Sequence, residues 1–204
     1  MRHLIFILTI FASILLSLTA MGQQKVEVIV ASPGYPPEDN ELSMCSLGCA
    51  MGWLTTASSH LPPQGKNKYD VLNIDDFRID TAWIEGVEGY GIGESITFKF
   101  PKEAFDEAKI KDKINFNGFI LVNGYCKNKQ TWQDNSRVKR VLIAHNGRPL
   151  FEAKFHNSMN IQRVYIDNIY LKSGDTVRVT ILEVYRGDKY KDTAISELVP
   201  TGAH

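Results

Sequence analysis

The sequence lacks the motifs of the common hydrolase and nucleotide-binding enzymes. It contains no Gly-x-Ser-x-Gly, no His-Glu-x-x-His and no Walker loop, and no motif pairs a cysteine with a histidine. It therefore gives no positive sign of an enzyme. One catalytic hypothesis remains, a small glycosidase using two of Glu85, Glu88 and Glu94, because that reaction needs only two acids facing each other across a cleft.

An excess of charge of one sign is also absent. The chain has 23 Lys and Arg residues against 23 Asp and Glu residues, and residues 1–22 contribute only Arg2 to this count. Without residues 1–22 the net charge is about −1, which gives no electrostatic reason to expect nucleic acid or an anionic membrane as partner. The balance favours uncharged ligands.

Long hydrophobic runs are missing after the first twenty residues. The chain starts with Arg2 and His3, continues with an apolar run over residues 4–18, and then has the small residues Ala20 and Gly22. This three-part layout predicts a secretory signal peptide over residues 1–22 and a mature protein that is secreted or periplasmic. A retained membrane anchor is the alternative, but the run is short for a bilayer span and no cysteine follows it to accept a lipid.

Cysteine is scarce, with three residues in the whole chain. An exported protein with three thiols can close one disulfide, and the short spacing favours Cys45 with Cys49, leaving Cys126 as a buried free thiol. Pairing of Cys126 with either of the other two is the alternative. The five histidines do not fall at ligand spacing near these cysteines, so a zinc site is not expected.

The sequence is rich, by contrast, in short β-strand patterns. Eight segments carry β-branched and aromatic residues between turn signals, namely residues 53–59, 95–100, 116–122, 138–145, 150–155, 161–171, 176–185 and 194–199. Only residues 102–111 have helical character. We therefore predict an all-β jelly-roll sandwich of about eight strands over residues 53–200, preceded by an extension or linker over residues 23–52 and followed by a tail over residues 201–204.

Two segments carry residues suited to sugar binding. Residues 81–100 join a tryptophan and four glycines to a strand, which predicts a shaped loop that holds Glu85 at the rim of a sheet. Residues 123–139 add aromatic rings and planar donors. We predict Tyr125 and Trp132 as a stacking platform for a pyranose, with Asn135, Arg137 and Glu85 as partners of its hydroxyls. The alternative is that these are partly buried aromatics and an arginine paired with an acid.

Several separated motifs together resemble a known family. They are Ala57-Ser58-Ser59, Asn73, Asp76, Thr81-Ala82-Trp83, Glu85-Gly86, Gly91-Ile92-Gly93-Glu94, Asn123-Gly124-Tyr125, Asn135, Arg137, Tyr185, Gly187, Tyr190 and residues 192–197. In this order they resemble the glycan-binding domain associated with bacterial NAD glycohydrolases, which is similar to discoidin and galactose-binding jelly rolls. The resemblance implies a β-sandwich and, more weakly, carbohydrate recognition by loops at one end. It does not imply NAD hydrolysis, because the catalytic domain of those toxins is a separate segment.

The same resemblance implies a structural calcium site. Many galactose-binding-like folds hold the ion before a Thr-x-Trp motif, and Asp76, Thr81 and Glu197 match the positions of its ligands. Arg78 occupies a position where an oxygen ligand is usual, and its cation disfavours Ca²⁺ and could pair with Asp76 or Glu197 instead. No cofactor is required, and calcium is optional.

The function predicted from the sequence is therefore an exported, non-catalytic glycan-binding module, with a further protein partner at the cell surface as an open option. The alternative from a different class is a structural or protein-interaction module on the same fold without sugar specificity.

Overall fold

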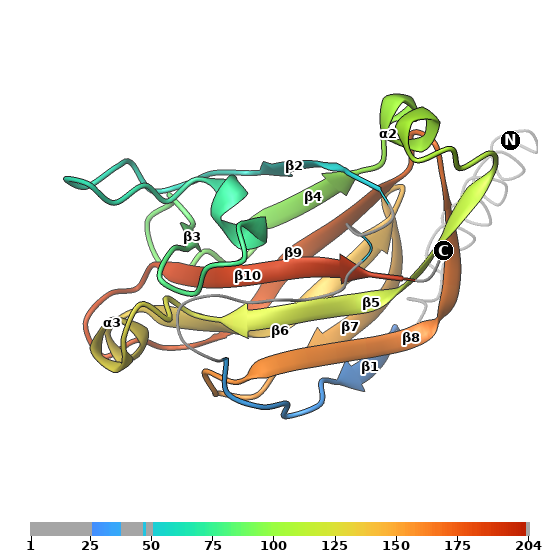
Figure 1. Ribbon diagram of the computed structural model, residues 1–204. Helices are drawn as coiled ribbons and strands as arrows, with labels where there is room; N and C mark the ends of the chain where they lie inside the picture. The colour runs from blue at the N-terminus through green and yellow to red at the C-terminus, as the bar shows by residue number, and fades with distance from the viewer. Residues whose placement is uncertain (1–25, 38–46, 48–50, 203–204) are drawn as a thin grey trace, which may run out of the picture.

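The computed structural model describes residues 26–37, 47 and 51–202 (Figure 1). The predicted signal peptide and the predicted Cys45–Cys49 pair lie outside these residues. The described strands are β1 (Glu27–Val30), β2 (Leu54–Ala57), β3 (Trp83–Ile84), β4 (Ser95–Lys99), β5 (Lys113–Asn123), β6 (Ser136–His145), β7 (Arg148–Lys154), β8 (Ile161–Lys172), β9 (Thr176–Tyr185) and β10 (Thr193–Thr201). Between them lie the helices α2 (Lys102–Glu107) and α3 (Lys129–Asp134) and the 3₁₀ turn η2 (Val71–Asp75).

The strands form a β-sandwich in which the two layers are joined into one hydrogen-bonded sheet. One layer runs in the order β2-β4-β9-β6-β7-β1, and the other runs β3-β10-β5-β8. The layers meet where β6 and β10 pair in parallel, over only two residue pairs, Ser136 with Thr193 and Arg137 with Ala194. The mostly antiparallel order and the sandwich confirm the predicted fold class.

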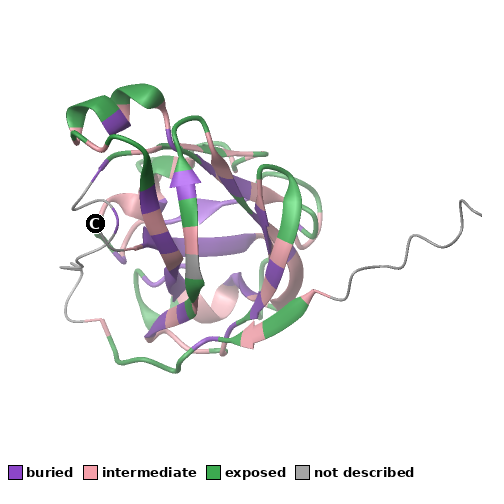
Figure 2. Ribbon diagram, turned by 90° about the vertical axis from the view of Figure 1, so that its right-hand side faces the viewer, coloured by how far each residue is buried: buried purple, intermediate pink, exposed green. Residues whose placement is uncertain are grey.

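Alternation along the strands produces the core between the layers. In β4, Ile96 and Phe98 are buried while the residues between them are not, as expected for a strand with one face against a core. Phe98 packs on Phe119 with ring centroids 5.6 Å apart, and Phe119 packs on Phe116 at 5.1 Å. Figure 2 shows the buried segments lining the interior and the exposed ones on outer faces and turns. Such aromatic packing supplies much of the hydrophobic stabilisation.

All eight predicted strands are present, and the described part of the chain contains ten strands rather than about eight. The additional ones are β1 and β3, which were predicted as extension and as loop. β1 pairs in parallel with β7, so this part of the predicted extension belongs to the sheet. β3 has two residues and pairs with Ala194 and Ile195 of β10. A segment of two residues, such as β3, is too short for an alternation pattern to be recognised.

The predicted helical segment contains α2, which ends at Glu107. The second helix, α3, was not predicted, because Trp132 is the one apolar residue in it and a single apolar residue shows no helical repeat. None of the helices in the described part of the chain is long and apolar enough to cross a membrane. Cys126 is a buried free thiol, as predicted, and burial raises its pKa to about 12. It therefore remains a neutral thiol at physiological pH.

Candidate functional site

A pocket of about 350 Å³ opens at one end of the sandwich, which we call the loop end. It lies between the hairpin loop (residues 61–69), the α3 loop (residues 124–135) and the last loop (residues 186–192), which Figure 1 shows side by side on its left. Its lining residues are Leu61, Gln64, Asn67, Tyr69, Ile84, Tyr125, Lys127, Asn128, Thr131, Asn135, Tyr190 and Asp192. This mixture of aromatic rings, amides and a few charges is typical of a small-ligand site.

Tyrosines form the aromatic part of the pocket wall. Tyr69 and Tyr125 are buried and meet edge to face, with centroids 6.2 Å apart and planes at 89°. Burial, with smaller effects of Tyr69 and Asp80, raises the pKa of Tyr125, so its phenol stays protonated. Tyr190 differs, because 43% of it is exposed. It is the ring in this pocket most accessible to a ligand.

The hairpin loop is fixed from both sides. Gln64 and Asn67 exchange backbone hydrogen bonds of 3.0 Å across a tight turn. At the base, the Ile84 carbonyl accepts from the Leu61 amide at 2.8 Å, and the Ile84 amide donates to the Tyr69 carbonyl at 3.3 Å. The loop is therefore attached to β3, which positions its side chains over the pocket.

The α3 loop is held by Arg137, which is buried under it. The guanidinium donates to the carbonyl oxygens of Asn135 at 2.7 Å and Trp132 at 2.8 Å, and Nε donates to Oδ1 of Asn157 at 2.9 Å. It also lies 4.4 Å from the ring centroid of Trp132. A buried arginine satisfied mainly by carbonyls organises the backbone and has few donors left for a ligand.

Trp132 is part of this support. Its indole N–H donates to the carbonyl of Asn123 at 2.8 Å, and the ring packs against Arg137 and Gly124. Gly124 has φ +93, and a Cβ there would lie 2.8 Å from Cδ1 of Trp132, so this approach requires glycine. The predicted stacking ring therefore faces the protein, and it does not line the pocket.

Glu85 is fully buried, with 0% exposure. Its carboxylate accepts from the Thr193 amide at 3.1 Å and the Val87 amide at 2.9 Å, which connects the glycine loop to β10. Burial raises the pKa of Glu85, and the two amide bonds oppose that shift. This residue, predicted to bind hydroxyls, is placed away from the pocket wall as well.

The structure thus brings together two of the five predicted ligand-binding residues, Tyr125 and Asn135, on the pocket wall. The Asn135 amide nitrogen donates to the Thr131 carbonyl at 2.8 Å, which fixes the direction of its side chain. Sequence reasoning did not single out Lys127 and Asp192 as site residues, although both line the pocket. The available signal was their position relative to the family motifs, because Asp192 begins the motif of residues 192–197 and Lys127 lies two residues after Tyr125.

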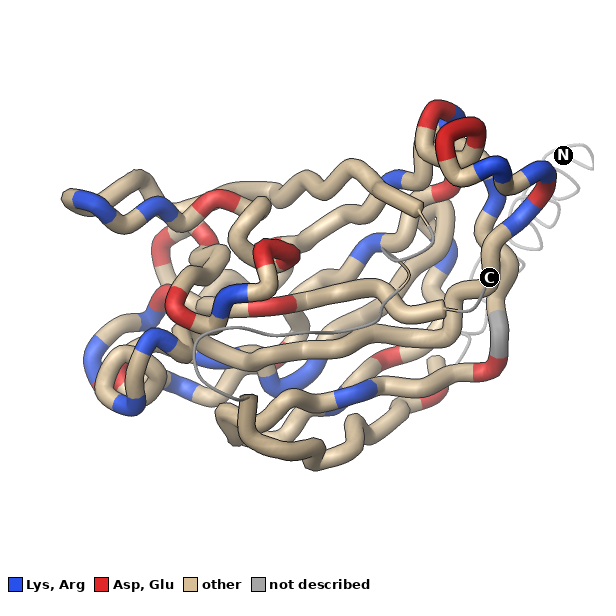
Figure 3. The backbone as a smooth tube through the Cα atoms, in the orientation of Figure 1, with Lys and Arg blue, Asp and Glu red and all other residues tan. Residues whose placement is uncertain are grey.

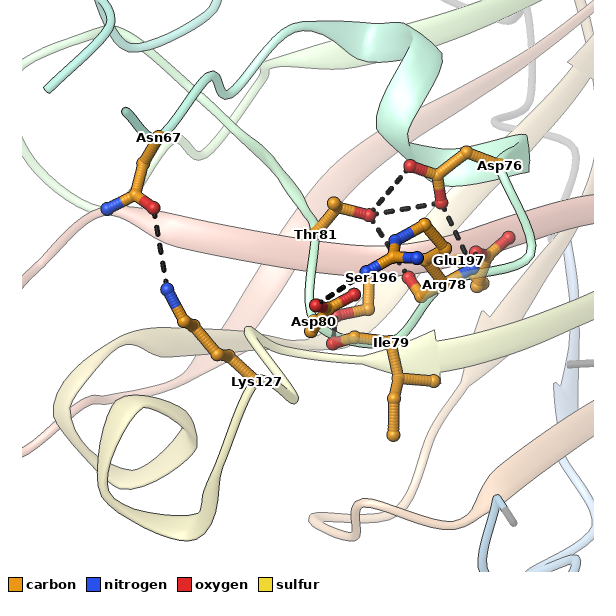
Figure 4. A network of polar contacts seen from close by, with 9 residues as sticks. All are labelled: Asn67, Asp76, Arg78, Ile79, Asp80, Thr81, Lys127, Ser196 and Glu197. Atoms are coloured by element: carbon orange, nitrogen blue, oxygen red, sulfur yellow. Dashed lines mark hydrogen bonds and ion pairs between the residues drawn. The ribbon is translucent and has the colours of Figure 1, made fainter. Parts of the chain in front are cut away.

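The three predicted calcium ligands lie together at a second location, where the two ends of the loop 76–81, Asp76 and Thr81, meet Glu197 of β10 (Figure 4). Thr81 Oγ1 donates to Asp76 Oδ2 at 2.8 Å and lies 3.1 Å from the carbonyl oxygen of Arg78. Glu197 is fully buried, and its Oε2 has no hydrogen-bond partner. Burial, with Asp76 as a smaller cause, raises the pKa of Glu197 to about 9.

Arg78 contacts this cluster through its backbone. Its amide N–H donates to Glu197 Oε1 at 2.7 Å and to Asp76 Oδ1 at 3.0 Å, while its guanidinium pairs with Asp80 at 2.8 Å. The sequence-based alternative named Asp76 and Glu197 as partners of the Arg78 guanidinium; both carboxylates accept from the Arg78 amide. Two carboxylates, one of which has a buried oxygen without a partner, together with a hydroxyl and a carbonyl, fit the oxygen preference of Ca²⁺.

Catalysis of the glycosidase type would require two carboxyl groups facing each other across the pocket. Among the described residues, Asp192 is the single carboxyl group on the pocket wall. Of the three acids considered for this role, Glu85 bonds backbone amides, and Glu94 accepts from Ser58 Oγ at 2.6 Å and from Ser59 Oγ. The pocket wall therefore lacks, among the described residues, the carboxyl pair that this mechanism requires.

Comparison with known proteins agrees with this geometry. Residues 49–200 match the sequence profile of the NAD glycohydrolase translocation F5/8 type C domain. No curated protein matches the chain.

Solved structures share the fold at low sequence identity. A Clostridium perfringens module, CpGH89CBM32-5 in complex with GalNAc-β-1,3-galactose, matches with a TM-score of 0.51 and 17% identity, over 74% of this chain and 95% of that one. The CBM32-1 and CBM32-2 domains of C. perfringens ZmpB, in complex with GalNAc, give a TM-score of 0.54 at 10% identity, over 89% of this chain and 42% of that one. A larger ZmpB fragment that includes the M60 catalytic domain gives 0.53 at 9% identity, and the chain spans 17% of its length.

Proposed function

We propose a function from one premise, that this chain belongs to the NAD glycohydrolase translocation F5/8 type C domain family. The proposed function is binding of a glycan in the loop-end pocket, without catalysis. The observation that carries it is the pocket itself, where exposed Tyr190 faces amides and one acid on rigidly held loops. An aromatic ring beside amide and carboxylate groups suits a pyranose, whose faces are apolar and whose edges carry hydroxyls.

Each group on the wall has a definite part in this binding. Tyr190 packs against a sugar ring, Asn135 and Asp192 bond its hydroxyls, and the buried pair Tyr69 and Tyr125 forms the floor. The volume of about 350 Å³ is near the lower limit for ligand sites, which favours recognition of one or two sugar units. The structural neighbours from C. perfringens, solved with GalNAc or a GalNAc disaccharide, support this ligand class.

A glycan array with the purified chain tests the proposal, followed by calorimetric titration of the best ligand. Tyr190→Ala should weaken that binding by about 1–3 kcal/mol and leave the melting temperature unchanged, because an exposed ring is lost. Tyr165→Ala is the matched control, since Tyr165 is an exposed tyrosine on β8. If no glycan binds, or if both variants behave alike, the chain is better explained as a protein-interaction module.

We also propose that the cluster of Asp76, Thr81 and Glu197 holds a calcium ion that stabilises the loop beside β10. When bound, the ion would supply the positive charge that the unpartnered oxygen of Glu197 lacks. Thermal melting in Ca²⁺, in Mg²⁺ and in chelator tests this: Ca²⁺ should raise the melting temperature, and Glu197→Gln should abolish the increase. Equal melting in Ca²⁺ and in chelator would count against the ion.

Export is the remaining part of the proposed function. The layout of residues 1–22 supports cleavage near Ala20 or Gly22 and a secreted or periplasmic location. N-terminal sequencing of secreted material tests it. A protein that retains Met1 in the membrane fraction would contradict it.

A further inference from the structure

The neutral total charge of the chain conceals a strong local imbalance at the pocket. The hairpin loop and the α3 loop up to Gln133 together contain four lysines and no acid. The lysines are Lys66, Lys68, Lys127 and Lys129. All four are exposed, and none forms an ion pair with any residue that the structure describes.

The two loops meet at the mouth of the pocket. Lys127 Nζ lies 3.4 Å from Oδ1 of Asn67, a long contact that bridges them (Figure 4). Asn67 is flanked in sequence by Lys66 and Lys68, so this contact joins the lysine-bearing segments of the two loops. Figure 3 shows these positive segments at the tip of the hairpin loop and around α3.

The acids near this mouth do not neutralise it by ion pairing. Asp70 accepts from the Leu72 amide at 3.0 Å, and Asp134 accepts from the Gln130 side chain at 2.7 Å. Asp192 lies on the pocket wall, where it can accept hydroxyls. The last loop carries Asp188 as a further acid, together with three cations of its own.

From this juxtaposition we propose that the loop-end pocket selects acidic sugars, those that carry a carboxylate or a sulfate. The inference rests on the proposed glycan-binding function and specifies its ligand class. The sugar ring lies against the tyrosines, with hydroxyls toward Asn135 and Asp192, and its anionic group lies beside Lys127 on the pocket wall, with the hairpin lysines outside the wall adding to the positive potential. Free ammonium groups beside a hollow lined with low-polarity rings attract anions more strongly than they would on an open surface.

An extended polyanion fits this site less well. Nucleic acid is bound by a positive groove that follows the backbone over many nucleotides. Here the hairpin loop and residues 124–133 carry lysines and no acid, whereas the last loop, on the other side of the pocket, mixes Asp188 and Asp192 with three cations. The charge pattern therefore matches one anionic group on a small ligand.

The test compares ligands that differ only in charge. Trigalacturonate is titrated against its methyl ester, and galactose 6-sulfate against galactose, which separates carboxylate from sulfate as the recognised group. At about 50 mM salt the acidic member of at least one pair should bind roughly tenfold more tightly, and the preference should fall severalfold at about 300 mM salt, because screening shortens the range of the interaction.

Lysine variants then locate the effect. Lys66→Gln/Lys68→Gln and, separately, Lys127→Gln should each lower the ratio of acidic to neutral affinity by about threefold or more. Lys111→Gln is the matched control, because Lys111 is exposed near α2, at the other end of the sandwich (Figure 1), and should leave the ratio unchanged. Melting temperatures establish that each variant is folded.

The outcomes are distinguishable. Equal affinity for the charged and neutral members of both pairs would overturn this inference and leave the proposed function in place. A preference that none of the loop lysines changes, or equally tight binding of a short single-stranded DNA of similar charge, would also overturn it. Binding of no sugar at all would overturn both proposals.

Discussion

Two groups of residues at the loop end look alike in sequence and differ in what they contact. In the support beneath the α3 loop, the Trp132 N–H and the Arg137 guanidinium are used within the protein, on carbonyls and an amide oxygen. In the pocket, Tyr190 is exposed and Lys127 has one long contact. Both groups pair aromatics with cations, but only the second retains groups for a ligand. Polar atoms that are hydrogen-bonded within the protein therefore mark the support, and polar atoms without such partners mark the surface that is open to a ligand.

The largest effect is expected from removing an aromatic ring of the hydrophobic core, on which both groups of residues depend for their positions. Trp83 has 0% exposure, and its N–H donates to the Ser59 carbonyl at 2.9 Å. Trp83→Ala should lower the free energy of unfolding by about 3–5 kcal/mol, because it leaves a large cavity. Urea denaturation measures it, with Trp83→Phe as the milder replacement. A loss below about 1 kcal/mol would mean that the ring is not part of the core.

Arg137→Met should be the next largest effect. It removes the donors that hold the α3 loop and leaves carbonyls without partners, at a cost of about 2–4 kcal/mol in unfolding free energy. The same denaturation experiment applies, and Arg148→Met, at an exposed position of the β6–β7 turn, is the control. Should Arg137→Met keep full stability but lose sugar affinity, Arg137 would belong to the binding surface and the comparison would fail.

Gly124→Ala affects both groups at once. The added Cβ would lie 2.7 Å from Cγ of Arg137 and 2.8 Å from Cδ1 of Trp132, on a backbone with φ +93. We expect a loss of about 1–3 kcal/mol in unfolding free energy and weaker glycan binding, since the α3 loop must shift. Gly147→Ala is the control, because its φ is +78 but nothing lies within 4 Å of the added carbon. Equal losses in the two variants would show that strain alone is responsible.

The smallest effect concerns the second buried glutamate. Unlike Glu85, Glu197 has an oxygen without a partner, and its pKa of about 9 exceeds its ordinary value of 4.5. A raised acid pKa means that the folded state favours the protonated form, so stability falls as pH rises from about 4.5 to about 9. Glu197→Gln should therefore gain about 1–2 kcal/mol at pH 8 in chelator, relative to wild type.

Chemical denaturation at pH 5 and pH 8 measures this gain, and Glu88→Gln, at an exposed position, is the control. The gain should shrink at pH 5, because this pH is close to the ordinary pKa of 4.5 and the carboxyl group is then partly protonated in the unfolded chain as well. A variant that is less stable than wild type at both pH values would show that the carboxylate is needed in its charged form.

The sequence was sufficient to predict the longer strands, but it was insufficient to predict contacts between loops. Strands such as β8 and β9 have many residues with a clear pattern, whereas β3 has two and depends on pairing with β10. The family motifs located Asp76, Thr81 and Glu197, which the fold brings together although Glu197 is far away in the chain.

The residues of the pocket were harder to assign. Residue type shows that Arg137 can bind a hydroxyl, but its donors go to carbonyls of the α3 loop and the last loop, which converge only in the fold. The lysines around Asn67 were missed for a different reason. In a charge count over the whole chain, the positive charge of these lysines is cancelled by acids that lie elsewhere. The fold shows that the two lysine-containing loops meet.

The position of β10 has a consequence for the order of folding during synthesis. This strand is buried along its whole length and pairs with β3, β5 and β6, yet it is the last of the described strands to be synthesised. Until residue 201 is available, β5 lacks one neighbour and the two layers lack their connection. We expect the sandwich to stay open until β10 has been synthesised, because these pairings span long sequence separations.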